Sequence, residues 1–496
     1  MNKTALKPKT QKEVLESTIQ RCRERNIVIP SYEEMKHPEK IPAGIRQELS
    51  KIGLWDVHPL NLFRITWKNQ PVKTGGGFAG VNFLEYPSLL TGVKARIITL
   101  LGKFFPTGSH KVGASFGPLV EKLVRGDFDP TRQKAVWPST GNYCRGGAYN
   151  SALLACPAVA ILPEGMSRER FEWLKQIGAE IYATPGSESN VKEIYDKCHA
   201  LKAEYGDQVV ILNQFEDFAN PAWHYWVTGG AMEEVYRQEK KPGQNLFGVF
   251  LTQGSAGTLA SGDYLKDRYP QVKIMAGEAL QCPTILYNGY GDHRIEGIGD
   301  KHIPWVLNVK SLDLAAGIDD DYTLRVLRLF NEPAGRQYLK QLGLPQGTAD
   351  QLDLLGISSI ANLMGAVKLA KYYECDENQI IFTVATDSTE LYQSRLAELR
   401  EKYGEYRERD AAADYQRCLM GLTLDHIEEF SYWQKKRVHN LKYFTWVEQQ
   451  GKTVEELNAQ WYDSGYWSKK WDKVKEWEKL IREFNQKTGV EKQYRK

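Results

Sequence analysis

Lys111 is the residue of this sequence whose type and place most strongly suggest chemistry. It follows the Gly-Ser-His turn in FPTGSHKVGASFG, residues 105–117, and stands where a predicted helix begins. An ammonium group that is shielded from water costs free energy unless its charge is neutralised or used. The role of Lys111 therefore depends on the groups that converge on it.

Three segments that follow apolar strands carry small or polar residues, and ligands of open parallel sheets bind beyond the carboxyl ends of the strands. QGSAGT, residues 253–258, has two glycines before a predicted helix, so its backbone N–H groups can approach a phosphate. PSTGNYCRGG, residues 138–147, offers groups that bind a carboxylate, and VATDSTEL, residues 384–391, ends its strand on Asp387 and Ser388. Each segment alone is more typical of an ordinary turn or helix cap.

Together with Lys111, these segments supply an amine, a phosphate cradle, a carboxylate-binding turn and a hydroxyl or carboxyl group. Pyridoxal phosphate is an aldehyde that carries a phosphate and a pyridine nitrogen, and it uses all four. The combination predicts this cofactor, with Lys111 holding it as a Schiff base.

The elements that position these residues read as α/β. Short apolar runs alternate with helical stretches in two series, which predicts two three-layer α/β/α domains with mostly parallel sheets. We expect a helical N-terminal extension over 1–60, a part carrying the lysine and the asparagine loop over 61–230, a part carrying the phosphate loop over 231–399, and a helical, Trp-rich tail over 400–496. Trp467, Trp471, Val474, Ile481 and Phe484 follow helical spacing, so the tail is expected to lie on the core or on a second subunit rather than to form a separate module.

Six motifs in order resemble the fold type II pyridoxal-phosphate enzymes of the tryptophan synthase β superfamily. PTGSHK is closest to the lysine motif of tryptophan synthase β chains, while STGN and GSAGT resemble the asparagine and phosphate loops of cysteine synthases. NQFEDFANPAWHYWVTGG, HRIEGIGDKHIP and the pair GISS and TDSTELY resemble later cysteine synthase segments. The resemblance covers roughly residues 60–398, and within the superfamily this segment is similar to cysteine synthases and cystathionine β-synthases.

The resemblance implies a role for each matching residue. Lys111 would be the catalytic residue, which holds the cofactor and moves the proton at Cα, and Asn142 would bind the oxygen on the cofactor ring. The residues implied at the phosphate are Gly254, Ser255, Ala256, Gly257 and Thr258, and those implied at the substrate carboxylate are Ser139, Thr140, Gly141 and Gln214.

Ser388 is implied as the partner of the pyridine nitrogen, and a shift of one residue would place Asp387 there instead. A hydroxyl partner leaves the ring a weaker electron sink, which favours loss of a leaving group from Cβ over transamination. His110 either donates to the phosphate or satisfies its own turn. Tyr143 and Cys144 are bulkier than the residues that usually follow the asparagine, so the pocket around the substrate side chain is expected to differ.

The implied function is β-replacement or β-elimination on a small amino acid through an aminoacrylate intermediate, as in a cysteine synthase. One alternative is a serine/threonine dehydratase or cysteine desulfhydrase-type lyase. A second, of another class, is a non-catalytic scaffold. The resemblance also implies a homodimer or higher homo-oligomer.

Composition narrows the other possibilities. Among 496 residues, 65 Lys and Arg stand against 62 Asp and Glu, a net charge of +3 that predicts neither a nucleic acid nor a membrane surface as partner. The 7 cysteines include no C-x-x-C pair and the 9 histidines no H-E-x-x-H pair, so we expect reduced thiols and no metal. With no long apolar run and a polar start, the expected location is the cytoplasm.

Overall fold

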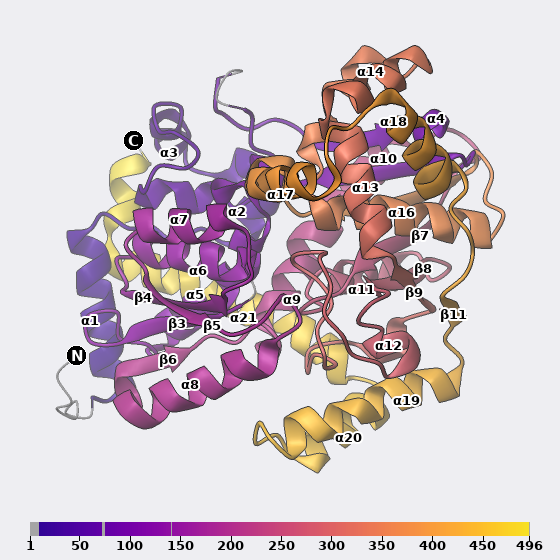
Figure 1. Ribbon diagram of the computed structural model, residues 1–496. Helices are drawn as coiled ribbons and strands as arrows, with labels where there is room; N and C mark the ends of the chain where they lie inside the picture. Colours follow the sequence, from indigo (N-terminus) through magenta and orange to yellow (C-terminus); the bar gives the residue numbers. More distant parts are fainter. Residues whose placement is uncertain (1–8, 72–74, 140, 496) are drawn as a thin grey trace.

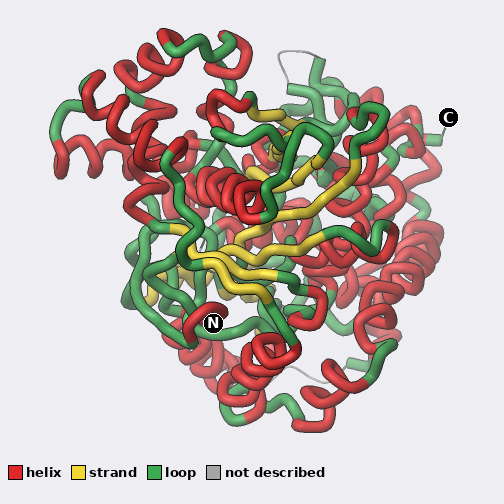
Figure 2. Tube along the Cα trace, turned by 90° about the vertical axis from the view of Figure 1, so that its right-hand side faces the viewer, coloured by secondary structure: helices red, strands yellow, loops and turns green. Residues whose placement is uncertain are grey.

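Two β-sheets organise the protein. The computed structural model describes residues 9–71, 75–139 and 141–495, so Thr140, expected at the substrate carboxylate, lies outside the described residues. Figure 2 shows the strands in the interior of the molecule, with helices on either side of them. Two sheets covered by helices are the arrangement that the alternating runs predict.

The smaller sheet is parallel throughout and has the order β5-β4-β3-β6. Its strands are β3 (Lys134–Pro138), β4 (Ala158–Pro163), β5 (Glu180–Thr184) and β6 (Val209–Ile211). Alternate side chains point to opposite faces of this sheet. Val136 and Ile161 pack with helix α8 (Val191–Tyr205), whereas Trp137 and Leu162 belong to the main hydrophobic core. Burial on both faces explains why β3 and β4 read as continuous apolar runs, whereas the edge strand β5 is largely open to solvent.

The larger sheet has the order β1-β2-β10-β7-β8-β9-β11, with antiparallel strands at its two edges. Its strands are β1 (Phe83–Tyr86), β2 (Arg96–Leu101), β7 (Asn245–Thr252), β8 (Lys273–Ala279), β9 (Leu314–Ile318), β10 (Gln379–Ala385) and β11 (Ile427–Glu429). It takes strands from three of the four predicted parts, because β2 pairs with β10 and the tail contributes β11. The expectation of strand-free sequence after about residue 399 is therefore wrong at β11.

Most helices cover the two sheets. The helices that precede β7 in the chain are α1 (Gln11–Glu24), α2 (Tyr32–Lys36), α3 (Ala43–Leu49), α4 (Ser88–Thr91), α5 (Lys111–Arg125), α6 (Asn142–Leu153), α7 (Arg168–Gln176), α8 (Val191–Tyr205), α9 (Ala219–Trp223) and α10 (Gly229–Glu239). Those that follow are α11 (Leu259–Arg268), α12 (Thr284–Tyr287), α13 (Asp320–Asn331), α14 (Pro333–Gln341), α15 (Gln346–Ala349), α16 (Ile357–Tyr372), α17 (Gln393–Tyr403) and α18 (Glu408–Tyr415). Both α5 and α6 begin at a residue implied in the site, and a π-helical turn over His224–Thr228 joins α9 to α10.

The tail lies on the core, as predicted. It contains α19 (Tyr432–Lys442), α20 (Val454–Tyr462) and α21 (Tyr466–Thr488), and the stripe of five apolar residues on α21 is buried. Helix α21 contacts α1, α5 and α9, and Arg23 of α1 donates to the carbonyls of its last turn. Figure 1 shows α19 and α20 at the bottom of the molecule, where Tyr432 packs on Trp461. In the part of the chain that the structure describes, no helix has both the length and the apolar character to cross a membrane.

Candidate active site

Lys111 begins helix α5 beside the loop between β7 and α11. Its Nζ donates to Ser255 Oγ at 3.2 Å, and the same hydroxyl accepts from Asn220 Nδ2 at 3.2 Å. Burial lowers the pKa of Lys111 to about 8, although the carboxylates of Asp300 and Glu188 oppose this. The structure thus brings the predicted lysine to the predicted phosphate loop, with an amine that loses its proton near neutral pH.

The loop over residues 253–258 holds its backbone close to its surroundings. Ala256 has a left-handed φ of 61°, and a Cβ on Gly257 would lie 2.5 Å from Asn220 Oδ1. A Cβ on Gly254 would lie 3.1 Å from the carbonyl oxygen of Gly297. Small residues here leave the amides at the start of α11 close to Lys111, which suits an anion.

The asparagine loop meets the carboxyl end of β10. Asn142 Nδ2 donates to Asp387 Oδ2 at 2.6 Å, and Tyr392 Oη donates to the same oxygen at 2.6 Å. Burial raises the pKa of Asp387. Among the described residues, buried Asp387 Oδ1 and Ser388 Oγ have no hydrogen-bond partner, so both of these neighbours keep polar capacity for a ligand.

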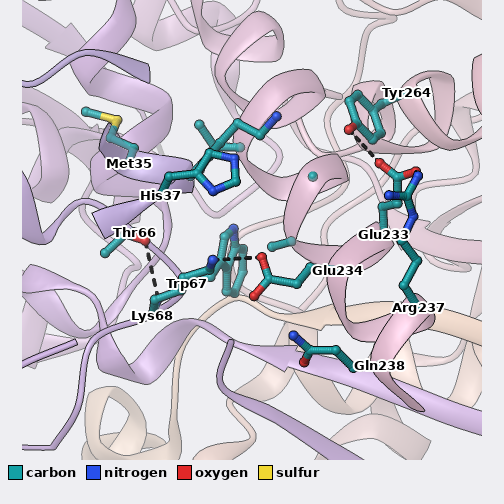
Figure 3. A pocket seen from close by; sticks show the side chains of 14 residues that line it. Met35, His37, Thr66, Trp67, Lys68, Glu233, Glu234, Arg237, Gln238 and Tyr264 are labelled. Carbon is teal, nitrogen blue, oxygen red and sulfur yellow. Dashed lines mark hydrogen bonds and ion pairs between the residues drawn. The ribbon is translucent and has the colours of Figure 1, made fainter. Parts of the chain in front are cut away.

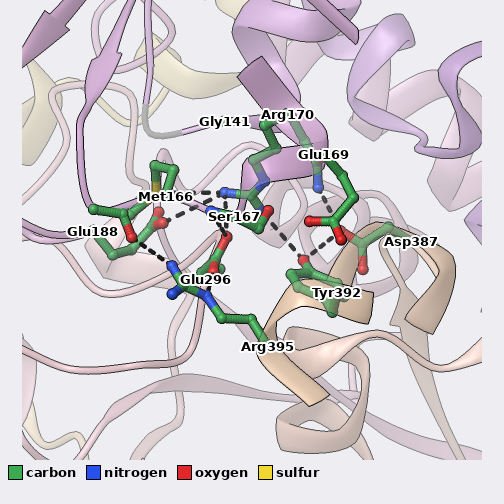
Figure 4. A network of polar contacts seen from close by, with 12 residues as sticks. Gly141, Met166, Ser167, Glu169, Arg170, Glu188, Glu296, Asp387, Tyr392 and Arg395 are labelled. Carbon is green, nitrogen blue, oxygen red and sulfur yellow. Dashed lines mark hydrogen bonds and ion pairs between the residues drawn. The ribbon is translucent and has the colours of Figure 1, made fainter. Parts of the chain in front are cut away.

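A buried arginine joins this junction to two further segments (Figure 4). Arg170 of α7 is fully buried and lies 3.0 Å from Glu296, and its guanidinium donates to Tyr392 Oη at 3.1 Å. Glu296 also pairs with Arg395 at 2.6 Å. A Cβ on Gly141 would lie 2.2 Å from Arg170 Nη1, so the asparagine loop rests directly on this guanidinium.

Asp300 is the site residue that sequence reasoning missed. It lies in HRIEGIGDKHIP and is 2% exposed, and its Oδ2 has no partner among the described residues. Burial raises the pKa of Asp300 to about 7, although the Lys111 ammonium opposes this. The signal in the sequence is its position directly after the Gly-Ile-Gly turn, in a segment that resembles one of cysteine synthases.

Two substrate-side residues are buried. Ser139 Oγ accepts from the Gly141 amide at 3.0 Å, and Gln214 is 4% exposed, with its backbone carbonyl accepting from Asn220. Their roles toward a carboxylate stay predictions.

The neighbours of Lys111 and Asn142 are occupied inside the fold. His110 Nε2 lies 3.3 Å from Thr386 Oγ1, while its ring packs on Trp67 and His224. Burial raises the pKa of the Cys144 thiol to about 12, and the thiol donates to the Gly141 carbonyl, which argues against a nucleophile.

A separate cavity of about 380 Å³ lies between the end of α2 and helix α10 (Figure 3). Trp67 lines it and packs on His110. Lys68 pairs with Glu234 at 2.7 Å and Arg237 with Glu233 at 2.6 Å, whereas the Lys36 ammonium lies over the rings of Trp226 and Tyr264. Because two of the three Lys and Arg side chains that line the cavity are already paired, it favours the cofactor's phosphate less than the loop at Lys111 does.

Comparison with known proteins defines the class. Residues 72–337 match the model of the pyridoxal-phosphate dependent enzyme family, and the chain belongs to that family. It is therefore an enzyme that uses pyridoxal phosphate, and at the family level its chemistry is β-replacement or β-elimination on amino acids.

Three relatives locate the chain within the class. It is 31% identical to a cysteine synthase of Staphylococcus aureus over 290 residues, which are 58% of this chain and 84% of that protein. It is 28% identical to the cystathionine beta-synthase of Saccharomyces cerevisiae, covering 62% of this chain and 59% of that one. A hydrogen sulfide-producing enzyme from Fusobacterium nucleatum has the same fold, with a TM-score of 0.53, 24% identity and coverage of 70% of this chain and 93% of that one. The predicted fold class and family are thus confirmed.

The residues present fit the cofactor. Lys111 offers a partly buried amine, the 253–258 loop offers close backbone amides, and Ser388 and Asp387 offer buried polar atoms without partners among the described residues. These are the groups that an aldehyde, a phosphate and a pyridine nitrogen need.

Proposed function

We propose that the protein catalyses β-replacement on a small amino acid that carries a leaving group at Cβ, with a thiol or sulfide as the incoming nucleophile. The observation that carries the proposal is the 3.2 Å contact between Lys111 Nζ and Ser255 Oγ, which joins the partly buried amine to the glycine-rich loop. The similarity to cysteine synthase supports the thiol or sulfide.

Bound pyridoxal phosphate supplies an electrophilic aldehyde and an electron-accepting ring. Lys111 would hold the cofactor through Nζ and, as a free amine, would take the proton from the substrate Cα as a general base. Its depressed pKa, about 8, gives a useful population of the neutral amine near neutral pH. Residues Gly254 to Thr258 bind the phosphate, and Ser139, Thr140, Gly141 and Gln214 orient the substrate carboxylate.

At the other end of the cofactor, we assign Asn142 to the ring oxygen and Ser388 to the pyridine nitrogen. Asp387 already accepts from Asn142 and Tyr392, which supports a structural role for its Oδ2 and favours Ser388 as the ring partner. The free Oδ1 of Asp387 keeps the alternative open to test.

Asp300 is the second group that we assign to proton transfer. Its pKa, about 7, and its electrostatic coupling to Lys111 let a proton reside on either side chain near neutral pH. A carboxyl group of this kind can take a proton from an incoming thiol or give one to a leaving group.

Asp300 also favours the second candidate, β-elimination, because the same carboxyl can take a proton from water. The similarity to a hydrogen sulfide-producing enzyme points the same way. The third hypothesis, an idle scaffold, has no support, since the chain belongs to an enzyme family and retains the lysine and both loops.

The test combines spectra with product assays. Purified protein loaded with pyridoxal phosphate is mixed with L-cysteine, L-serine and O-acetyl-L-serine, with and without sulfide. We expect a shift in the cofactor absorbance and formation of cysteine or a thioether. Keto-acid and ammonia without any replacement product would establish elimination instead, and no spectral change with any amino acid would contradict both. Light scattering of the same preparation tests the homodimer, which stays a prediction.

A further inference from the structure

The C-terminal tail grips the segment that follows Asp300. Lys442, the last residue of α19, is fully buried, and its ammonium donates to the carbonyls of Trp305 at 2.9 Å and Leu307 at 2.7 Å. Its third bond goes to Gln460 Oε1 of α20 at 2.7 Å. An ammonium has three N–H donors, so all of them are used.

Trp446 supplies a second hold on the same segment. Its indole Nε1 donates to the Ile303 carbonyl at 2.8 Å, and its ring centroid lies 5.7 Å from that of His302. We call Lys442, Trp446 and Gln460 the tail clamp. Its three side chains are fully buried and bind backbone oxygens of residues 303–307, which begin three residues after Asp300.

Residues 303–307 also contact the segment that carries Gln214, one of the residues predicted to bind the substrate carboxylate. The amide of Val306 donates to the Phe215 carbonyl at 3.2 Å, next to Gln214, and Lys452 of the tail pairs with Glu216 at 2.6 Å. The backbone of Asp300 is held as well, because its carbonyl accepts a hydrogen bond from Thr284 Oγ1 at 2.8 Å. The tail therefore contacts both the segment that follows Asp300 and the segment that follows Gln214.

We propose that Lys442 and Trp446 are positioning residues, which fix the backbone at 303–307 and thereby set the place of the Asp300 carboxyl relative to Lys111. The tail lies outside residues 72–337 that match the family, so this control comes from a part of the chain that the family match does not include. The inference rests on the role of Asp300 in the proposed function.

The choice of groups supports positioning over simple attachment. Burying an ammonium against neutral acceptors is costly, and apolar contacts alone would attach a tail at lower cost. Three directed bonds to two neighbouring carbonyls and one amide fix a position as well as a contact. A displacement of about 1 Å at a reacting group can lower a rate about 100-fold.

The experiment is a double-mutant cycle of Lys442→Met with Asp300→Asn in the full-length, cofactor-loaded enzyme. Alone, Lys442→Met is expected to lower kcat about 10- to 100-fold with little change in KM. In the Asp300→Asn background it should lower kcat further by less than about twofold, because the group that it positions is already gone. Lys436→Met is the matched control. Lys436 lies on the same helix, and its ammonium lies over the rings of Trp461 and Tyr462. Among the described residues it has no hydrogen bond or ion pair with residues 300–307.

Hydrogen exchange gives a readout independent of activity. Amides of residues 299–307 should exchange faster in Lys442→Met and at the wild-type rate in Lys436→Met, with or without cofactor. If Lys442→Met does not fold, Trp446→Phe enters the same cycle, because it keeps an aromatic ring and removes the indole N–H that donates to the Ile303 carbonyl. A smaller effect on kcat in the same direction is expected for it.

Equal losses of kcat in both backgrounds, or a wild-type kcat with unchanged exchange, would overturn the positioning role. Failure of the proposed function looks different: wild-type protein would convert no amino acid, or Asp300→Asn would leave kcat unchanged while the clamp variants still exchange faster.

Discussion

The two ends of the candidate active site are built in opposite ways. At the lysine end, Lys111 is partly buried and Asp300 is buried, the pKa values of both are shifted, and no salt bridge joins either of them to another described residue. At the ring end, Asn142, Asp387 and Arg170 are tied into a continuous network of hydrogen bonds and ion pairs. The groups proposed for proton transfer are thus held without a salt bridge, whereas the groups at the ring end are fixed by several partners, although Asp387 Oδ1 and Ser388 Oγ have no hydrogen-bond partner among the described residues.

The difference predicts which substitutions affect chemistry and which affect stability. Changes at the lysine end should alter rates and pH profiles while the fold persists. Changes at the ring end should lower the free energy of unfolding first. Four substitutions test this division.

Replacing Lys111 should have the largest effect. Lys111→Ala removes both the attachment point and the base, so kcat is expected to fall at least about 1,000-fold, with the melting temperature of the protein without cofactor nearly unchanged. Steady-state kinetics and thermal melting measure the two quantities. A variant that retains even a tenth of wild-type kcat would contradict the role assigned to Lys111.

Replacing Arg170 should unfold rather than merely slow the enzyme. Arg170→Met leaves Glu296 buried with one partner fewer, and breaking a buried pair costs about 3–5 kcal/mol. Denaturant unfolding checks the value. Arg168→Met on the same helix is the control, because its side chain is 73% exposed and should change little. Equal effects of the two would show that the network does not carry the stability assigned to it.

Replacing Asp300 should move a pKa. Its carboxylate raises the pKa of Lys111, so Asp300→Asn lowers that pKa and increases the neutral amine at a given pH. The rate of cofactor attachment to the protein without cofactor should rise with pH around a midpoint near 8 in the wild type. In the variant the midpoint should be about one unit lower.

Absorbance stopped-flow measures this rate. Asp292→Asn, whose side chain is 71% exposed, should keep the wild-type midpoint. A midpoint for Asp300→Asn that stays the same or moves to higher pH would contradict the coupling.

Replacing Gly257 should have the smallest effect. In Gly257→Ala the new methyl group lies 2.5 Å from Asn220 Oδ1, so the loop must shift, and cofactor affinity should fall about fivefold to tenfold, from the low end of overpacking costs. Fluorescence titration measures the affinity. Gly347→Ala, with open space around its Cβ, is the control. Unchanged affinity in Gly257→Ala would remove this loop from the phosphate site.

The sequence permitted the prediction of the parts of the site that depend on local order. A lysine at a helix start and small residues after apolar strands are visible because strand ends in a parallel sheet meet at one edge. Arg170 was not predictable, since it lies in SRERFEWLKQ two residues from exposed Arg168 and only the tertiary fold separates them. Lys442 is hidden for the same reason: in YWQKKRVHNLK it resembles its solvated neighbours, and the two backbone carbonyls that it binds lie more than a hundred residues away. Strand β2 beside β10 also depends on a long-range pairing that no local pattern specifies.

The central claim is that Lys111 carries the cofactor. Borohydride reduction of the loaded enzyme followed by peptide mass spectrometry tests it directly. The account predicts one phosphopyridoxyl group per chain, on the peptide that contains Lys111. A stoichiometric label on any other lysine, with Lys111 unmodified, would contradict it.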